Sequence, residues 1–361
     1  MTSNPKTENM ITKIKKIIHH SAIISKHKNI QNPKSAVELM FDLAYWTFLN
    51  HGRIKNFFLL GLNQKGTRVS DYLNYQSLKP YYKEFYPENY LCLLEDKQVF
   101  EKFINNFPEH APKNIGYVTQ QYFYLTDGIP QPIENILKYP MKCIVKNTMG
   151  FGGKDIFILT IDSGNLFING EKSTIQEFIK RLPERSVLQE LLEQHEDVKR
   201  LHPSSINTSR IVTVNTGSKV EIISTFLRIG NGGNVVDNIS KGNIYVPIDR
   251  KNGKLGKIGQ SNNDPLVFYS HPQTNIVFDG YQLPYFQEAL DLCKKLHYQL
   301  PYFFILGWDI AFTPKGPVVI ESNNIHQIVD EQEFEGALKK QFDQYIKEFM
   351  ENKKERKPAY A

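Results

Sequence analysis

The sequence predicts an α+β fold with more than one subdomain, and three observations support this. The chain has 361 residues, more than the roughly 250–300 residues at which a single hydrophobic core stops growing. Its 40% hydrophobic and 23% charged residues are typical of a folded globular protein. Helical spacing of apolar residues dominates both ends, whereas short β-branched and aromatic runs fill the centre without regular alternation of strand and helix.

The N-terminal part is expected to be helical. Apolar residues recur with helical spacing over Ile11–Lys26 and Ala36–Asn50, and a proline-containing stretch separates the two segments. The surplus of positive charge is concentrated in Lys13–Lys28 and in the tail Lys353–Lys357. Two solvated ends explain this surplus. Alternatively, because isoleucines give the first segment a partly apolar side, the basic helix lies on an anionic membrane or against a partner.

Several classes of protein are excluded by composition. The longest apolar stretches, such as Ile305–Phe312, are much shorter than the roughly 20 residues that span a bilayer. No secretory signal precedes the first helix, so we expect a cytoplasmic protein. Cys92, Cys143 and Cys293 are widely spaced and are expected to be ordinary thiols, without a disulfide framework or a zinc site. The net charge of +6 is mild for this length, and we expect no nucleic-acid partner.

The remaining elements follow in order. Tyr72–Tyr90, rich in tyrosine, is assigned only as irregular structure or short helix, and an amphipathic helix from Glu95 ends at Pro108. Short strands are then expected at Cys143–Lys146, Ile156–Thr160, Asn165–Ile168, Val187–Glu190, Arg210–Asn215, Val220–Ile229 and Ile244–Ile248, with a helix at Thr174–Leu182. A helix over Pro284–Leu300, a hairpin of Ile305–Phe312 with Val318–Glu321, and a charged helix over Glu331–Lys353 complete the chain.

A glycine-rich segment, Lys146–Asp155, lies between two expected strands. Its Gly150, Gly152 and Gly153, flanked by lysines, make a backbone loop that can approach a polyphosphate closely and aim N–H groups at it. No helix follows, so the segment is neither a P-loop nor a Rossmann fingerprint. A lid over a nucleotide fits this pattern, and a plain hairpin turn is the alternative.

The end of the strand at Val187–His195 is a second candidate. Apolar residues give way there to Gln189, Glu190 and Glu193, which can offer backbone groups to an adenine and a carboxylate to ribose hydroxyls. The start of a helix is the alternative interpretation.

Two carboxylates in the expected hairpin form the third candidate. If the connecting loop is Thr313–Pro317, Phe312 pairs with Val318, and counting back places Asp309 directly opposite Glu321 on one face. Opposed side chains have Cβ atoms about 4.5–5.5 Å apart, so the two acids repel each other unless a cation lies between them. A shift of one residue in the register would separate them.

Asn323 lies two residues beyond Glu321 and shares its face. Because Mg²⁺ takes hard oxygen ligands and bridges to phosphates, we expect these three side chains to hold magnesium. A solvated hairpin is the alternative.

Arg210 enters an apolar strand, where an always-charged guanidinium is costly unless it meets an anion. A phosphoryl group or a substrate carboxylate is the expected partner, and a surface-facing edge strand is the alternative. The polar segment Asp237–Asn243 between strands suits a substrate loop, and it contains Asn238 and Lys241. The histidines form no recognisable nucleophilic triad.

In this order, the glycine-rich loop, the strand-end Gln-Glu, the Asn-Thr-x-Arg segment, Gly-Trp-Asp and Glu-x-Asn resemble the ATP-grasp superfamily. More narrowly, the chain resembles the sugar-transfer-associated ATP-grasp proteins, which are related to alpha-L-glutamate ligases. The resemblance covers about Lys97 to Asn323 and implies an ATP-grasp fold in which two α+β subdomains clasp ATP. We therefore expect residues 1–95 to form an N-terminal helical, substrate-side region, residues 96–200 the small lid subdomain, and residues 201–361 the large subdomain with the magnesium site.

The resemblance also implies roles for individual residues. Nucleotide phosphates would contact Lys97 and Lys146 beneath the glycine-rich loop, and Arg210 would stabilise an acyl-phosphate or its tetrahedral successor. Catalytic roles are further assigned to Asn238 and Lys241. The adenosine would be bound by Gln189, Glu190, Leu192 and Glu193, and magnesium by Asp309, Glu321 and Asn323.

The implied reaction joins a carboxylate to an amine at the expense of ATP. The lack of a nucleophilic triad is compatible with it, because phosphoryl transfer needs positioning and charge neutralisation rather than a protein nucleophile. An amino acid or amine attached to a sugar carboxylate in exopolysaccharide synthesis is the expected chemistry. The segment Glu321–His326 lacks the proline that follows this motif in many amino-acid ligases, which puts the acceptor in doubt. A kinase on the same fold and a nucleotide-binding accessory protein of glycan assembly, docked through the basic N-terminal helix, are the alternatives.

Overall fold

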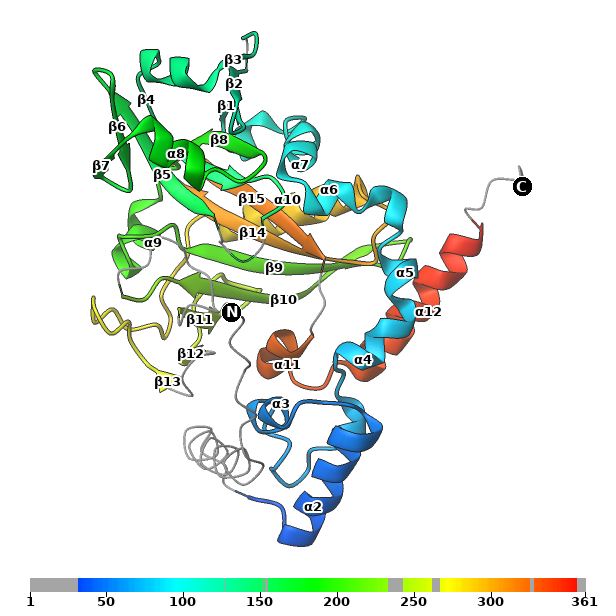
Figure 1. The fold of residues 1–361 in the computed structure, drawn as a ribbon. Coiled ribbons are helices and arrows are strands. Elements are labelled where there is room, and N and C mark those ends of the chain that lie inside the picture. Colours follow the sequence, from blue (N-terminus) through cyan, green and yellow to red (C-terminus); the bar gives the residue numbers. More distant parts are fainter. Residues whose placement is uncertain are drawn as a thin grey trace, which may run out of the picture.

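The computed structural model describes residues 32–126, 128–150, 152, 155–232, 243–261, 267–324 and 328–355. Two antiparallel sheets and the helices around them make an α+β molecule, as the sequence predicts (Figure 1). The expected helix Ile11–Lys26, Gly153 of the glycine-rich loop, and the segment with Asn238 and Lys241 lie outside the described residues.

The N-terminal region consists of short helices. The expected helix Ala36–Asn50 is α2 (Ala36–Ala44), continued by a π-helical turn, η1 (Tyr45–Leu49). Ser35 and Glu38 form a capping box that begins α2. The following short elements are α3 (Ile54–Leu59), η2 (Val69–Asp71), α4 (Tyr75–Leu78), η3 (Lys79–Tyr81), α5 (Tyr82–Phe85), η4 (Glu88–Tyr90) and α6 (Cys92–Glu95).

The first sheet has eight strands in the order β3-β2-β1-β8-β4-β5-β6-β7. Helix α7 (Lys97–Ile104) precedes it, capped by Asp96, and η5 (Pro108–His110) follows that helix. The strands are β1 (Asn114–Val118), β2 (Tyr122–Leu125), β3 (Gln131–Pro132), β4 (Met141–Asn147), β5 (Ile156–Asp162), β6 (Asn165–Ile168), β7 (Glu171–Ser173) and β8 (Ser186–Glu190), with η6 (Ile133–Lys138) and α8 (Ile175–Arg181) between them.

The second sheet has seven strands in the order β13-β12-β11-β10-β9-β14-β15. They are β9 (Thr208–Asn215), β10 (Val220–Ile229), β11 (Ile244–Pro247), β12 (Gly259–Ser261), β13 (Val267–Phe268), β14 (Ile305–Thr313) and β15 (Gly316–Asn324). The helices of this part are α9 (Glu196–Leu201), α10 (Phe286–Tyr298), α11 (Val329–Glu335) and α12 (Lys339–Glu355).

Helix α10 covers one face of the second sheet and leaves the other face free for a site. On the covered face, the Thr213 hydroxyl of β9 lies 2.7 Å from Nδ1 of His297 in α10, and Trp308 of β14 donates a hydrogen bond to the same hydroxyl. Side chains alternate along a strand, so Arg210 in β9 and Asp309 in β14 point to the opposite face. That face lies toward the first sheet and toward α11 (Figure 1).

Two expected boundaries are wrong. The charged C-terminal helix predicted over Glu331–Lys353 is two helices, because Gly336 adopts φ 79° and ψ −152°, a conformation that no helix can continue through. The helix predicted to begin at Pro284 begins at Phe286, because its N-cap Tyr285 has a left-handed backbone (φ 51°).

Candidate active site

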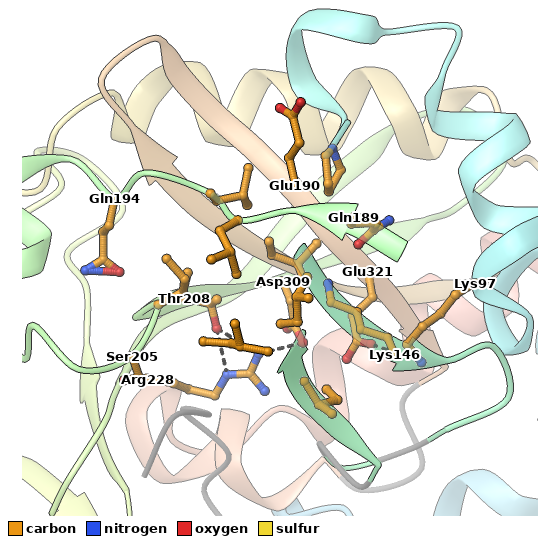
Figure 2. A pocket seen from close by; sticks show the side chains of 18 of the residues that line it. Lys97, Lys146, Gln189, Glu190, Gln194, Ser205, Thr208, Arg228, Asp309 and Glu321 are labelled. Atoms are coloured by element: carbon orange, nitrogen blue, oxygen red, sulfur yellow. Dashed lines mark hydrogen bonds and ion pairs between the residues drawn. The ribbon is translucent and has the colours of Figure 1, made fainter. Parts of the chain in front are cut away.

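A cavity of about 530 Å³ lies between the two sheets. The first sheet and its loops contribute residues of β4, β5 and β8 to its lining, and the second sheet contributes residues of β9, β10, β14 and β15. Figure 2 shows Lys97, Lys146 and Glu321 close together at one side of this cavity, with Asp309 and Arg228 beside them. The cavity thus gathers charged side chains from strands that are far apart in the sequence.

Asp309 and Glu321 are directly opposite each other in the β14–β15 hairpin, as the sequence predicts. The route to this pairing differs from the prediction. Phe312 pairs with Pro317, not with Val318, so the turn is one residue tighter than expected. An irregularity in the register between Asp309 and Ile310 inserts one extra residue in β15, and this bulge restores the predicted pairing.

Asn323 completes a group of three side chains. Its amide nitrogen lies 3.3 Å from Oδ2 of Asp309 and 3.4 Å from Oε1 of Glu321. Because the Asn323 amide can be turned to present its oxygen instead, the three side chains can surround one point with oxygen atoms that could bind a metal ion. No cluster of three His, Cys, Asp or Glu side chains suited to a metal occurs among the described residues. A two-carboxylate site of this kind fits Mg²⁺, which takes its remaining ligands from phosphates and water.

Two arginines neutralise Asp309. Arg210 of β9 donates from Nε to Oδ1 at 2.6 Å, and a terminal nitrogen of Arg228 of β10 lies 2.5 Å from Oδ2. Arg228 also donates to the hydroxyl of Thr208 at 2.9 Å from its terminal nitrogen. Both guanidinium groups are largely buried, so each depends on an anion. A cation bound at Asp309 would share this carboxylate with the arginines.

The ionisation of Asp309 is set by opposing effects. Burial of the carboxyl group alone would raise its pKa, but the charges of Arg210 and Arg228, and their hydrogen bonds, outweigh burial and lower the pKa to about 2. Asp309 is therefore a carboxylate at neutral pH.

Two lysines complete the charged end of the cavity, Lys146 from β4 of the first sheet and Lys97 from the start of α7. Lys146 of β4 is buried, and burial lowers its pKa to about 8; the Glu321 carboxylate opposes this shift, and the Lys97 ammonium adds to it. Lys97 lies 3.7 Å from Glu321. Four cationic side chains thus face two carboxylates here, and the surplus of positive charge suits a polyanion.

The glycine-rich loop is tied to this group. Nζ of Lys97 donates to the carbonyl oxygen of Gly150 at 2.5 Å, and the backbone N–H of Lys97 donates to the carbonyl of Thr148 at 2.9 Å. Gly150 and Gly152 line the cavity, and Gly152 has a left-handed backbone (φ 66°). The loop connects β4 to β5, between two antiparallel strands, as the sequence predicts.

The strand-end residues line the other part of the cavity. Gln189, Glu190, Leu192 and Glu193 all contribute atoms to its lining, together with Gln194. The side-chain oxygen Oε1 of Gln189 is buried and has no hydrogen-bond partner. A buried acceptor of this kind is costly unless a ligand donates to it, and the exocyclic amine of adenine is a donor of the right type. Glu190 instead points outward enough to form an ion pair with Lys113 at 2.7 Å.

Arg228 is the site residue that sequence reasoning missed. It enters the apolar strand β10 in the same way that Arg210 enters β9, so the argument that selected one arginine applies equally to the other. What the sequence did not reveal is that the two strands are neighbours, with Arg210 opposite Phe226 and Arg228 opposite Thr208. Thr208, which belongs to the predicted Asn-Thr-x-Arg segment, also lines the cavity, as does Ser205.

The sequence profile of the family described as sugar-transfer-associated ATP-grasp matches residues 76–341. Among solved structures, the chain is similar to D-alanine–D-alanine ligase from Bacillus anthracis, at 11% identity over 73% of this chain and 70% of that one, with a TM-score of 0.39. It is also similar to N5-carboxyaminoimidazole ribonucleotide synthetase from Thermotoga maritima, at 12% identity over 70% of this chain and 48% of that one, with a TM-score of 0.34. The chain therefore spans about half of the latter protein. A comparison with curated proteins gave no match.

Proposed function

Because the chain belongs to the sugar-transfer-associated ATP-grasp family, we propose that it is an ATP-dependent ligase that joins a carboxylate to an amine. The observation that supports this proposal is the charged end of the cavity. Lys97, Lys146 and two arginines surround the acid pair there, and this arrangement suits a metal–polyphosphate more than any neutral ligand. When bound, Mg-ATP supplies the phosphoryl group that activates the carboxylate.

In this proposal each residue has a role that follows from its position. Asp309, Glu321 and Asn323 hold the metal ion, and Lys97 and Lys146 neutralise phosphate oxygens under Gly150 and the rest of the glycine-rich loop. The buried oxygen of Gln189 accepts from the adenine amine, with Glu190 and Leu192 beside it and Glu193 at the ribose.

Arg210 and Arg228 are suited to the acidic substrate. Their guanidinium groups can form paired hydrogen bonds to a carboxylate or an acyl-phosphate, and they lie beside the metal-binding carboxylate, where the new charge develops. Asn238 and Lys241 are retained in this proposal as residues of the substrate loop. The substrate class that we propose is a sugar carboxylate with an amino acid or amine as acceptor, in polysaccharide synthesis at the cytoplasmic side of a membrane.

A screen for nucleotide consumption tests the proposal. The protein is incubated with Mg-ATP and pairs of uronic acids and amino acids, and ADP, AMP and phosphate are measured. Release of ADP and phosphate that requires both a carboxylate and an amine, with an amide detected by mass spectrometry, is the expected result. Release of ADP without any dependence on substrate would count against a ligase, and AMP would indicate adenylation instead.

One variant makes the screen specific. Glu321→Gln removes one proposed metal ligand but keeps the size of the side chain, and we expect at least about a hundredfold loss of turnover. A stable phosphorylated product without an amide would point to the kinase alternative. Unchanged ATP turnover in Glu321→Gln would remove the basis of the proposal. If cells that carry Glu321→Gln still made the normal amount of polysaccharide, the accessory-protein alternative would be favoured.

A further inference from the structure

One helical ridge of the N-terminal region leaves large apolar side chains uncovered. It is formed by the exposed side chains of Val37, Met40, Phe41, Tyr45, Phe48 and Leu49, which we call the α2 ridge. Phe41 is 67% exposed, Phe48 is 77% exposed and Leu49 is 73% exposed. Their spacing of three and four residues places them along one side of α2 and η1.

The ridge is not the side of the helix that holds the region together. Trp46 is fully buried, and Leu39 and Leu43 pack with it against Phe57 and the core of the N-terminal region. A helix that is apolar on its outer as well as its inner side is unusual for a surface helix in water. We therefore expect the outer side of this helix to bind another surface.

Cations border the ridge. A groove beside Phe41 and Phe48 is lined by Lys34, Lys65 and Arg68 and by the carboxylates of Glu38 and Asp42, and Lys34 pairs with Asp42 at 2.5 Å. Three cations and two carboxylates leave the described lining with one surplus positive charge, contributed by the exposed Lys65 and Arg68. The sequence extends this charge: residues 1–34 contain seven lysines and one glutamate, so they account for the entire net charge of +6, and the rest of the chain is neutral. The apolar ridge and the charge surplus of the whole protein thus belong to the same end of the chain.

We propose that the α2 ridge is a docking surface for an anionic phospholipid membrane, with the basic residues beside it contacting the headgroups. An apolar strip flanked by lysines and arginines is the pattern of a helix that lies in the membrane interface. A soluble protein partner of acidic character would need only the charges, and a second copy of this chain would bring the same positive charges face to face. Among the described residues, no helix is long and apolar enough to cross a membrane.

The position of the ridge is compatible with the proposed ligase. Helix α2 lies at the end of the molecule opposite the eight-stranded sheet (Figure 1), and no residue of α2 lines the cavity between the sheets. The inference extends the proposed function but does not depend on it, since neither the ridge residues nor the lysines belong to the cavity.

Co-sedimentation with vesicles tests the inference. The full chain is mixed with vesicles of phosphatidylcholine alone, or of phosphatidylcholine with phosphatidylglycerol, at rising salt. We expect binding to the second kind only, weakening as salt screens the charges. The double variant Phe41→Glu/Phe48→Glu should weaken binding about tenfold or more, because two apolar contacts become repelled carboxylates. The matched control is Ile129→Glu, an equally exposed apolar residue (78%) outside the ridge, which should bind as the parent does.

Each other outcome overturns the inference. If equal amounts of protein sediment with both kinds of vesicle, recognition of anionic lipid is excluded. If no protein sediments with either kind, membrane docking is excluded. Unchanged recovery of the double variant excludes the ridge, and a double variant that instead turns a dimer into a monomer in gel filtration assigns the ridge to a second copy. Circular dichroism and turnover of ATP, measured on the same samples, separate loss of docking from loss of folding and from failure of the proposed ligase activity.

Discussion

Lys146 combines two properties that oppose each other, a charge that the proposed reaction needs and a position that disfavours charge. Burial lowers the pKa of its ammonium group to about 8, below the ordinary value of 10.5. Below pH 8 the folded protein therefore holds a buried cation at a cost in stability. As pH rises from about 8 to 10.5, the unfolded chain keeps its proton while the folded one has lost it, so this cost is relieved.

Substitution of Lys146 by methionine should reveal this conflict. We expect Lys146→Met to raise the free energy of unfolding by about 1–3 kcal/mol at pH 7, with the gain shrinking as pH rises through 8 to 10.5. The same variant should lose nucleotide binding. Urea unfolding at several pH values measures the first effect, and Lys142→Met, on the same strand but exposed, is the control. A variant that is less stable at pH 7 than the parent would contradict the reasoning.

Asp309 is the opposite case, a charge that the fold itself needs. Asp309→Asn leaves the buried guanidinium groups of Arg210 and Arg228 without their carboxylate, and we expect it to lower the free energy of unfolding by about 3–5 kcal/mol at pH 7. The folded pKa of Asp309, about 2, lies below the ordinary 3.8, so its contribution is complete above pH 4 and is lost as pH falls toward 2.

Thermal or urea unfolding between pH 7 and pH 3 checks this expectation, with the difference between parent and Asp309→Asn narrowing toward acid. A constant difference over that range would show that the carboxylate charge is not what the arginines require. Glu321 lies 3.7 Å from Lys97 and 3.4 Å from the amide nitrogen of Asn323, and its charge also favours the ammonium form of Lys146. None of these contacts is a close ion pair, so Glu321→Gln should change stability by less than about 1 kcal/mol. Loss of turnover in Glu321→Gln is therefore the cleaner sign of a metal-binding role.

At the scale of elements, the break between α11 and α12 depends on one glycine. Gly336 has φ 79° and ψ −152°, a region open essentially only to glycine, and no heavy atom lies within 4 Å of the position of an added Cβ. Gly336→Ala should therefore cost about 1–3 kcal/mol of stability through backbone strain alone. Gly128→Ala is the control, because Gly128 has no positive φ and its nearest neighbour to an added Cβ is at 3.6 Å. Equal effects of the two substitutions in urea unfolding would exclude the strain argument.

The same glycine explains why the sequence predicted one helix where there are two. The helical spacing of apolar residues continues on both sides of Gly336, so this spacing predicted one continuous helix over Glu331–Lys353. The strands around the glycine-rich loop, by contrast, were predicted close to their bounds, since β-branched runs flanked by turn residues need no distant information. Strands β1 and β2 were missed, because they are short and tyrosine-rich, and β1 is held by pairing with β8, about 70 residues away in the chain.

The hairpin of β14 and β15 shows the limit of pattern reasoning within one element. The pairing of Asp309 with Glu321 could be predicted, but only because a wrong loop and an unseen bulge compensate each other. A bulge leaves no reliable trace in the sequence, since it is selected by packing around the extra residue. The Arg228 contact was out of reach for a related reason, because it depends on which strands are neighbours in the sheet.

At the scale of the whole molecule, the cavity belongs to neither sheet alone. Lys146 and Gln189 come from the first sheet, and Asp309 and Glu321 come from the second. The three-region division at residues 95 and 200 remains a prediction. The N-terminal region is joined to the rest through α11, where Gln332 accepts a hydrogen bond from the N–H of Leu73 and donates one to its carbonyl, both at 2.7 Å.

A ligand that contacts both sheets should stabilise them as one unit. Mg-ATP at a hundred times its dissociation constant would add about 2.7 kcal/mol to the stability of the folded state, or about 3–5 °C in Tm for a chain of this size. Both sides of the cavity should be necessary for this rise in Tm. Lys146→Met should raise the Tm of the protein without nucleotide and abolish the rise on addition of Mg-ATP. Glu321→Gln should leave the Tm without nucleotide nearly unchanged and lose the part of the rise that depends on magnesium. Glu351→Gln, on an exposed position of α12, should respond as the parent does. A full shift in either site variant would mean that the nucleotide is held by one sheet only, and the charged end of the cavity would then need another ligand.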